Sequence, residues 1–248
     1  MDKEALYVVL PCYNEEENIN RLIEEWECHE NSLYEKGILL KIVVVNDGSS
    51  DDTYKTSKSF ENIYKNIKLL NHDVNKGLGE AINTGINYVV AQKENGFLCI
   101  MDADMTHLPN YIFSMINKLK AEDLSCVIAS RYRKGSKVEG LSSFRKFLSF
   151  GARIAYTMNF RIPNVRDYTC GYRIYRIEAL NSLYVKYSGK IVKERGFTCM
   201  MELLVKLSRE GFKIGEVPFI LKYQLKGGKS KMRVWKTVYR SIVMLKKL

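Results

Sequence analysis

The sequence predicts an α/β fold in which a mainly parallel sheet is flanked by helices. Short apolar runs rich in β-branched residues, such as residues 41–45, alternate with longer segments of helical periodicity through the first half of the chain. Turn-forming residues follow these runs and mark the ends of the strands. The 248 residues, 46% of them hydrophobic, suffice for one large domain with a buried core.

The predicted elements follow one another in strand–helix pairs. The first strand covers residues 5–10 and ends at Pro11, and a helix follows over residues 15–28, where Asn14 and Glu17 have the spacing of a capping box. The next elements are a strand at 41–45, a helix beginning near residue 51 or 52, a strand at 67–70, a helix at 79–91, a strand at 97–101, a helix at 110–121 and a strand at 127–129. Beyond residue 133 the alternation fades, and the predicted elements are helices at 142–160 and 198–210 and a strand at 214–218.

Polar residues stand where four of the predicted strands end. Tyr13 and Asp47 come after the first and second strands, Asp102 follows the strand at 97–101, and Arg131 follows the strand at 127–129. The carboxyl ends of parallel strands share one edge of a sheet, and ligands of such folds bind beyond that edge. We therefore expect these four side chains around one site.

Asp102 and Asp104 form an acidic pair at the end of a buried strand. Residues i and i+2 of an extended segment point to the same side, so the two carboxylates converge while the methyl group of Ala103 turns away. Two hard oxygen ligands suit Mg²⁺ or Mn²⁺, which completes its shell with water and phosphate oxygens. An isolated Asp-x-Asp motif also fits a strand end and a helix cap ahead of Pro109, so the pattern alone leaves both interpretations open.

The formal net charge of +11 is concentrated near the C-terminus. Residues 222–248 contain nine Lys or Arg residues and no Asp or Glu. Within them, residues 231–248 place apolar residues, Trp235 and Tyr239 included, at helical spacing among the basic ones. This pattern predicts a basic amphipathic C-terminal helix, which either lies on an anionic membrane surface or packs on the domain. We divide the chain into a catalytic domain at 1–225 and a basic loop with this helix at 226–248.

Several functional classes are disfavoured by the sequence. No signal peptide and no apolar stretch of about 20 residues is visible, so we expect a cytosolic chain. The six cysteines include no C-x-x-C pair, which argues against a disulfide framework and a zinc site. A sugar nucleotidyltransferase is disfavoured, because it would need a Gly-rich phosphate loop at the N-terminus and the sequence has none there. A basic nucleic-acid-binding module without catalysis is the alternative from another class, but acidic residues at the strand ends oppose it, and we expect no nucleic-acid partner.

The motifs taken together resemble the inverting family 2 glycosyltransferases with the GT-A fold, and in particular the dolichyl-phosphate and polyprenyl-phosphate mannose synthase group. The resemblance runs from about residue 5 to 240 and rests on residues 10–15, 44–49, 101–104, 130–132, 145–146 and 228–231. It implies a Rossmann-like sheet, a GDP- or UDP-linked sugar donor, Mg²⁺ or Mn²⁺, and a polyprenyl phosphate acceptor.

The resemblance also implies roles for individual residues. Tyr13 would pack on the nucleotide base, and Asp47 would accept hydrogen bonds from the base or the ribose. Asp102 and Asp104 would hold the metal ion against the diphosphate. The residues that the resemblance assigns to the nucleotide-sugar donor are Pro11, Tyr13, Glu15, Val45, Asp47, Asp102, Ala103, Lys229, Ser230 and Lys231.

Asp104, Arg131 and Arg145 are the residues that the resemblance makes catalytic. The two guanidinium groups would grip the acceptor phosphate, the donor diphosphate or both. Thr106 stands where relatives have a Gln on the metal side, so water is an alternative third ligand. His107 matches the family motif, and we expect it to cap a helix or to pack rather than to ligate.

The acceptor side of the resemblance concerns residues 167–173. The Trp-rich motif of many sugar-acceptor members of the family is absent after this segment. This absence fits a phosphate acceptor, whose second pKa near ~6 leaves it ionised at neutral pH without a general base. Asp167 either orients Arg173 or forms a turn.

The implied activity is the metal-dependent, inverting transfer of a mannose- or glucose-type hexose to a dolichyl or undecaprenyl phosphate. We expect a cytoplasmic protein bound peripherally to the anionic inner face of the membrane. Thr169 and Cys170 leave an alternative activity open, which is that of a family 2 transferase that adds a sugar to a saccharide hydroxyl in cell-surface polysaccharide assembly. The residues do not distinguish which sugar or which base the donor carries.

Overall fold

The computed structural model describes residues 3–225 and 243, without the side chains of residues 143–147. The predicted helix at 231–248, apart from residue 243, and the loop residues Lys229, Ser230 and Lys231 lie outside the described residues. The division between residues 225 and 226 therefore stays a prediction.

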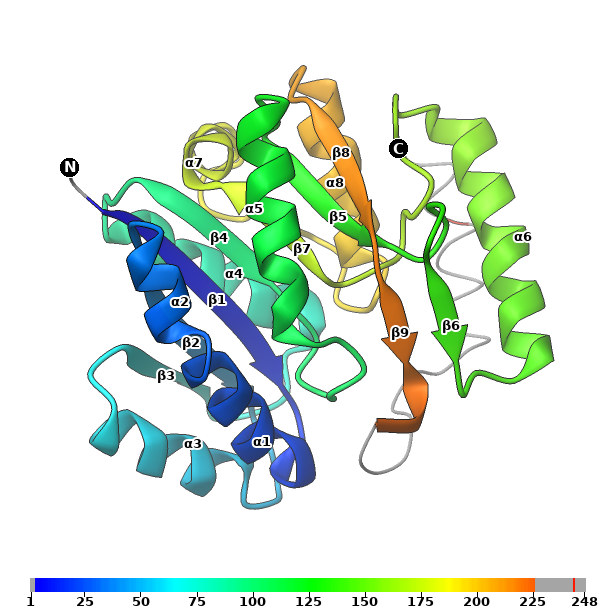
Figure 1. The fold of residues 1–248 in the computed structure, drawn as a ribbon. Helices are drawn as coiled ribbons and strands as arrows, with labels where there is room; N and C mark the ends of the chain where they lie inside the picture. Colours follow the sequence, from blue (N-terminus) through cyan, green and yellow to red (C-terminus); the bar gives the residue numbers. More distant parts are fainter. Residues whose placement is uncertain (1–2, 226–242, 244–248) are drawn as a thin grey trace.

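A seven-stranded sheet forms the centre of the molecule (Figure 1). Its strand order is β3-β2-β1-β4-β7-β5-β8, and β7 is antiparallel to both of its neighbours while the other described pairings are parallel. The strands are β1 (Glu4–Cys12), β2 (Ile38–Asp47), β3 (Ile67–His72), β4 (Gly96–Ile100), β5 (Cys126–Ser130), β7 (Arg173–Arg176) and β8 (Ile214–Pro218). The predicted α/β fold with a mainly parallel sheet is confirmed.

Helices cover both faces of this sheet. They are α1 (Glu16–Glu27), α2 (Glu30–Glu35), α3 (Thr53–Ile63), α4 (Leu78–Ala91), α5 (Ile112–Ala121), α6 (Ser143–Phe160), α7 (Ile177–Lys186) and α8 (Cys199–Arg209), with 3₁₀ turns at Pro109–Tyr111 and Tyr223–Leu225. Helices α4, α7 and α8 contact one another and lie behind the sheet in Figure 1, with α2 and α5 in front. Among the described residues, no helix has the length and apolar character needed to cross a membrane.

A second, two-stranded sheet stands at the side of the molecule. It pairs β6 (Lys137–Glu139) with β9 (Ile220–Lys222) in parallel. Helix α6 lies beside β6 and away from strands β1 to β4 (Figure 1). The small sheet and α6 thus extend the side of the molecule on which β5 and β8 lie.

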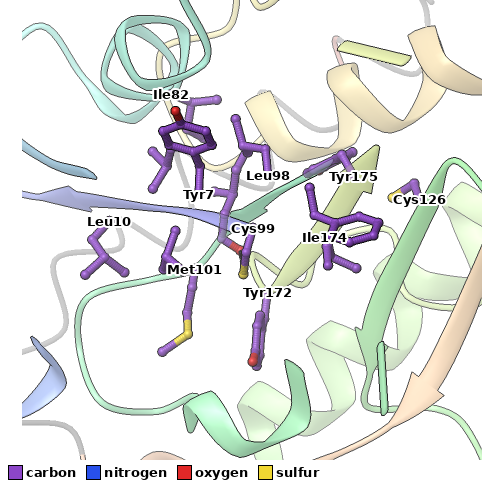
Figure 2. Close-up of a cluster of buried hydrophobic side chains, with 14 of the residues drawn as sticks. Tyr7, Leu10, Ile82, Leu98, Cys99, Met101, Cys126, Tyr172, Ile174 and Tyr175 are labelled. Carbon is purple, nitrogen blue, oxygen red and sulfur yellow. Dashed lines mark hydrogen bonds between the residues drawn. The ribbon is translucent and has the colours of Figure 1, made fainter. Parts of the chain in front are cut away.

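The hydrophobic core lies between the central strands and the helices. Figure 2 shows Ile82 of α4 beside Tyr7 of β1, with Leu98 of β4 and Ile174 of β7 in the same cluster, and all four are buried. Residues 5–10 are buried without alternation, as expected for a strand with helices on both sides. A Cβ on Gly85 would lie 2.4 Å from Cγ1 of Val9, so this glycine lets α4 approach β1 closely.

Two details of the predicted N-terminal region are wrong. β1 continues through Pro11 to Cys12, because its pairing with β4 ends at Val9 and a residue without an N–H is accommodated beyond that point. The capping box does not form, since Asn14 has a left-handed φ of 53° and its Oδ1 accepts a hydrogen bond from the N–H of Ser50. The helix nevertheless begins within a residue of the predicted start.

Candidate active site

The loops that follow β1 and β2 are tied together by hydrogen bonds. The N–H of Asn14 donates to Oγ of Ser49 over 2.9 Å, and the N–H of Ser50 donates back to Oδ1 of Asn14 over 2.8 Å. The N–H of Glu15 donates to Oγ1 of Thr53 over 2.7 Å. These reciprocal bonds hold the two loops at the same edge of the sheet.

Four of the residues predicted to bind the nucleotide lie in this region. Pro11 of β1 pairs in register with Val45 of β2. Tyr13 is 39% exposed, so part of its side chain can be reached from solvent. Glu15 accepts a hydrogen bond at Oε2 from Nδ2 of Asn18 over 2.8 Å, which orients its carboxylate. The structure brings these residues together, and their contact with a nucleotide stays a prediction.

Asp47 is buried and is bound by several protein groups. Its Oδ1 accepts from Nδ1 of His72 over 2.7 Å and from the N–H of Lys76 over 2.9 Å. Its Oδ2 accepts from the N–H of Gly77 over 2.8 Å. The other ring nitrogen of His72 lies 2.9 Å from Oγ1 of Thr84. Asp47 therefore fixes the loop between β3 and α4, and its predicted contact with the base or ribose would come in addition to this role.

The acidic pair follows β4, and its second member is oriented by a turn. Oδ1 of Asp104 accepts from the N–H of Thr106 over 3.1 Å and from the Thr106 hydroxyl over 2.6 Å. The turn passes through Met105, which is a buried residue with a left-handed φ of 62°. A non-glycine residue in this conformation is strained, and such strain is common at functional sites. The Thr106 hydroxyl thus acts on Asp104.

The first member of the pair is approached by the loop before β7. A Cβ on Gly171 would lie 2.8 and 2.9 Å from the carboxylate oxygens of Asp102, so any side chain at this position would force that carboxylate to move. Nδ1 of His107 lies 3.9 Å from Oδ2 of Asp102. The His107 ring centroid lies 5.7 Å from that of Tyr172 and 5.4 Å from that of Phe219. His107 packs among rings beside the acidic pair.

The donor atoms of the pair fit a divalent cation held partly by its substrate. The Asp102 side chain is 29% exposed and can be reached from solvent. Within the described residues, no group of three or more His, Cys, Asp and Glu side chains is placed to bind a metal ion. Mg²⁺ and Mn²⁺ accept such a site, because water and phosphate oxygens complete the shell around one or two carboxylates.

Arg131 is held by a fully buried carboxylate. Its Nε donates to Oδ2 of Asp167 over 2.8 Å, and its Nη2 donates to Oδ1 of Asp167 and to Oγ1 of Thr169, each over 2.6 Å. Burial raises the pKa of Asp167, but the charge and hydrogen bonds of Arg131 outweigh burial, and the pKa lies below its ordinary value. Asp167 therefore stays ionised and positions Arg131. The alternative in which it orients Arg173 is not the contact found.

A second buried carboxylate, Glu216 of β8, supports the same loop. Its Oε1 accepts from the N–H groups of Arg166 and Asp167 over 2.7 and 2.6 Å, and its Oε2 accepts from Nε of Arg133 over 2.7 Å. Burial raises the pKa of Glu216 above its ordinary value. Sequence reasoning missed this residue. Its signal was a charged residue in an otherwise apolar strand, which is uncommon unless the charge has a partner.

The remaining predicted site residues are placed less completely. The backbone of Arg145 lies in the first turn of α6, and its side chain is outside the described residues, as are Lys229, Ser230 and Lys231. Ala103 is buried between Asp102 and Asp104. Sequence reasoning also missed His72, because its contact with Asp47 joins residues that are far apart in the chain.

The chain is similar in sequence to known proteins. Residues 7–184 match the model of the family called Glycosyl transferase family 2. A dolichol-phosphate mannosyltransferase of Pyrococcus furiosus is 31% identical over 243 residues, which make up 94% of this chain and 62% of that protein. A dolichyl-phosphate beta-glucosyltransferase, ALG5A, of Trichomonas vaginalis is 30% identical over 221 residues, 86% of this chain and 64% of that protein. The chain thus spans less than two thirds of the length of these relatives.

A solved structure supports the fold. Glucosyl-3-phosphoglycerate synthase from Mycobacterium tuberculosis, in complex with Mn²⁺, UDP and glucosyl-3-phosphoglycerate, superposes with a TM-score of 0.65 at 18% identity. The match covers 98% of this chain and 80% of that one. The architecture is that of a GT-A glycosyltransferase. With the family match over most of its length, the chain belongs to glycosyltransferase family 2.

Proposed function

We propose that the chain transfers a hexose from a nucleotide-diphosphate sugar to a polyprenyl phosphate. The observation that carries this proposal is that one loop contacts both the acidic pair and a basic group. Asp167 binds Arg131, and Gly171 in the same loop abuts Asp102. Four residues of chain span at most about 14 Å, so Arg131 lies near the acidic pair. A diphosphate donor and a phosphate acceptor would fit this arrangement.

The donor side of the proposal rests on the residues after β1, β2 and β4. Pro11, Tyr13, Glu15, Val45 and Asp47 would form the nucleotide pocket. Asp102 and Asp104 would hold Mg²⁺ or Mn²⁺, which neutralises the charge of the leaving nucleoside diphosphate. The mycobacterial synthase with Mn²⁺ and UDP supports a metal and a nucleotide in this fold. Thr106 and Gly171 would keep the two carboxylates in position.

The acceptor side rests on Arg131 and Arg145, which would bind the acceptor phosphate. A phosphate oxygen is already ionised at neutral pH and needs no general base. Asp167 is unsuited to be one, because its oxygens accept hydrogen bonds from the Arg131 guanidinium group and from three backbone N–H groups. The names of the archaeal and protist relatives, which contain dolichol or dolichyl phosphate, support this acceptor class.

We infer inversion at the anomeric carbon. The acceptor oxygen forms its bond to that carbon on the face opposite the leaving group, and the bond to the nucleoside diphosphate breaks with the electron pair leaving on its oxygen. A covalent intermediate would need a carboxylate nucleophile. The buried carboxylates in the described part of the chain all accept hydrogen bonds from protein groups, and they are Asp47, Asp167, Glu202 and Glu216.

We propose that the reaction takes place at the cytoplasmic face of an anionic membrane. Residues 222–248 carry nine basic and no acidic residues. Each Lys or Arg near an anionic surface contributes about 1 kcal/mol of attraction, which salt weakens. Binding of the full chain and of a chain ending at Lys229 to anionic vesicles, measured by co-sedimentation at low and high salt, tests this placement. Equal binding by both chains would contradict it.

The transfer reaction itself is tested with the full chain and Mn²⁺. GDP-mannose and UDP-glucose are offered with dolichyl phosphate, undecaprenyl phosphate or a free saccharide as acceptor. We expect a β-linked product on a polyprenyl phosphate from an α-linked donor, identified by proton NMR. Transfer to the saccharide alone would replace the proposal by a polysaccharide-type transferase, and an α-linked product would refute inversion.

A further inference from the structure

Arg131 donates most of its hydrogen bonds to other groups of the protein. Its Nε and Nη2 donate to Asp167 and Thr169, and Nη1 donates no hydrogen bond within the described part of the chain. Its positive charge is offset by the buried Asp167 carboxylate. A phosphate monoester carries nearly two negative charges at neutral pH, so Arg131 alone neutralises little of it. The acceptor phosphate can therefore bind further cations besides Arg131, which include the proposed Arg145.

Arg153, in the third turn of α6, supplies a cation in a defined position. Its guanidinium carbon lies 4.9 Å from the ring centroid of Tyr132 and 5.7 Å from that of Phe150. It forms no ion pair with a carboxylate among the described residues. Stacking on an aromatic ring fixes the plane of a guanidinium group and leaves its N–H donors available at the edge.

Tyr132 connects this cation to Arg131. The Arg131 guanidinium carbon lies 5.5 Å from the centroid of the same ring. The Tyr132 hydroxyl lies 2.6 Å from Oγ of Ser149, which anchors the ring to α6. Burial raises the pKa of Tyr132, so the phenol stays neutral and offsets neither charge. Two guanidinium groups thus share one ring, with Asp167 as the carboxylate bound to one of them.

The surrounding sequence adds no negative charge. Residues 140–166 contain no Asp or Glu, and their basic residues are Arg145, Lys146, Arg153, Arg161 and Arg166. An anion that approaches Arg153 from this segment therefore meets no like charge on it.

We propose that Arg153 is an acceptor-binding residue whose guanidinium donates hydrogen bonds to the acceptor phosphate beside Arg131. Tyr132 is its positioning residue, since the ring that Arg131 faces is also the ring on which Arg153 stacks. The proposal rests on the proposed transfer to a polyprenyl phosphate. It differs from the resemblance in its residue, because the family motifs point to Arg131 and Arg145 only.

The test compares kinetic constants of full-length variants with a short-chain prenyl phosphate in detergent. Arg153→Ala removes a charge-assisted contact and should raise the KM for the acceptor about 10- to 100-fold. Arg153→Gln, which keeps the aliphatic stem through Cδ and a polar end but removes the charge, should raise it as well, and Arg153→Lys should give an intermediate value. Binding of GDP or UDP with Mn²⁺, measured by calorimetry, should not change.

Arg161→Ala is the matched control. Arg161 is an exposed arginine just after the end of α6 whose Nε donates to the carbonyl of Met158, and its removal lowers the net charge by the same amount. The control should leave the acceptor KM within about twofold, because exposed charges far from the phosphate act weakly. Tyr132→Phe keeps the ring but loses its anchor to Ser149, so it should raise the acceptor KM less than Tyr132→Leu, which removes the ring as well.

The outcomes separate this proposal from the function on which it rests. An unchanged acceptor KM in Arg153→Gln and Arg153→Ala, with transfer by the wild-type chain intact, overturns the role of Arg153 alone. An effect that appears on anionic vesicles and vanishes in detergent also overturns it, since Arg153 would then act on the lipid surface. Failure of the wild-type chain to use any prenyl phosphate overturns the proposed function. Melting temperatures show whether each variant folds.

Discussion

In the half of the molecule built on β1 to β4, strand-end residues are held by hydrogen bonds between neighbouring loops, whereas in the half built on β5, β7 and β8 they are held by buried ion pairs. Asn14 exchanges hydrogen bonds with Ser49 and Ser50 in the first half. In the second, Arg131 is bound by Asp167, which is fully buried. From this difference we expect the two halves to respond differently to substitution. Loss of a loop hydrogen bond costs about 1 kcal/mol, and loss of one member of a buried pair costs several times more.

The largest effect on stability is expected from Asp167→Asn. The substitution keeps the size of the side chain and leaves the charge of Arg131 without its partner, so the free energy of unfolding should fall by about 3–5 kcal/mol. Urea unfolding of both proteins measures it. Asp123→Asn is the matched control, because Asp123 is 85% exposed and pairs with Arg176 at 3.4 Å. That control should change stability by less than about 0.5 kcal/mol. Equal effects would contradict the comparison.

The same carboxylate predicts a pH dependence. The pKa of Asp167 in the folded protein lies below its ordinary value, because the charge and hydrogen bonds of Arg131 outweigh burial. Its contribution to stability is therefore complete above the unfolded-state pKa of about 3.9 and is lost as the pH falls through the lower folded value. The stability of the wild-type chain should fall more steeply below about pH 4 than that of Asp167→Asn. Parallel curves would contradict this assignment.

The contrast also shows where sequence reasoning reaches. Asp102 and Arg131 could be placed at strand ends, because each follows a short apolar run and parallel strands align their carboxyl ends. The antiparallel β7 could not, since Arg173–Arg176 is short and begins and ends with a charged residue. Its pairing with β4 and β5 depends on packing between segments that are far apart in the chain.

The hydrogen-bonding partners of the site residues could not be predicted from the sequence either. His72 and Asp47 are joined across 25 positions of the chain, and Arg131 and Asp167 across 36. A local pattern carries no record of such pairs, because they form only when the sheet brings separate loops together. The sequence indicated Asp167 as a turn former or a partner of Arg173. Its Oδ1 does accept hydrogen bonds from two N–H groups of the turn that follows, but the guanidinium group that it binds is that of Arg131.

In the β1–β4 half, the largest expected effect on activity comes from Asp104→Asn. The substitution keeps the fold and removes a negative charge from the proposed metal site, so transfer should fall by about 10²–10³-fold. The melting temperature should match that of the wild-type chain. The rate with excess Mn²⁺ and the rate in EDTA complete the test. A fully active variant, or full activity of the wild-type chain in EDTA, would remove the metal ion from the mechanism.

Gly171→Ala tests whether the two halves meet at the acidic pair. The added Cβ would lie 2.8 Å from an Asp102 oxygen and should displace that carboxylate. We expect the apparent affinity for Mn²⁺ in the transfer reaction to fall about 10- to 100-fold. Gly151→Ala is the control, because a Cβ there meets no atom within 4 Å. It should leave the Mn²⁺ dependence unchanged. Equal Mn²⁺ dependence in both variants would show that Gly171 does not shape the site.

The smallest effect is expected at Thr106, where a single hydroxyl orients Asp104. Its hydrogen bond to Oδ1 of Asp104 spans 2.6 Å and belongs to the turn through Met105. Thr106→Val keeps the shape and removes that bond. Its net value of about 1 kcal/mol corresponds to an approximately fivefold lower apparent affinity for Mn²⁺. Thr106→Ser keeps the hydroxyl and should retain the wild-type value. If Thr106 were instead a ligand of the ion, Thr106→Val should lose activity as Asp104→Asn does. A titration of the transfer rate with Mn²⁺ separates the two, because a positioning residue shifts the midpoint and leaves the rate at saturation.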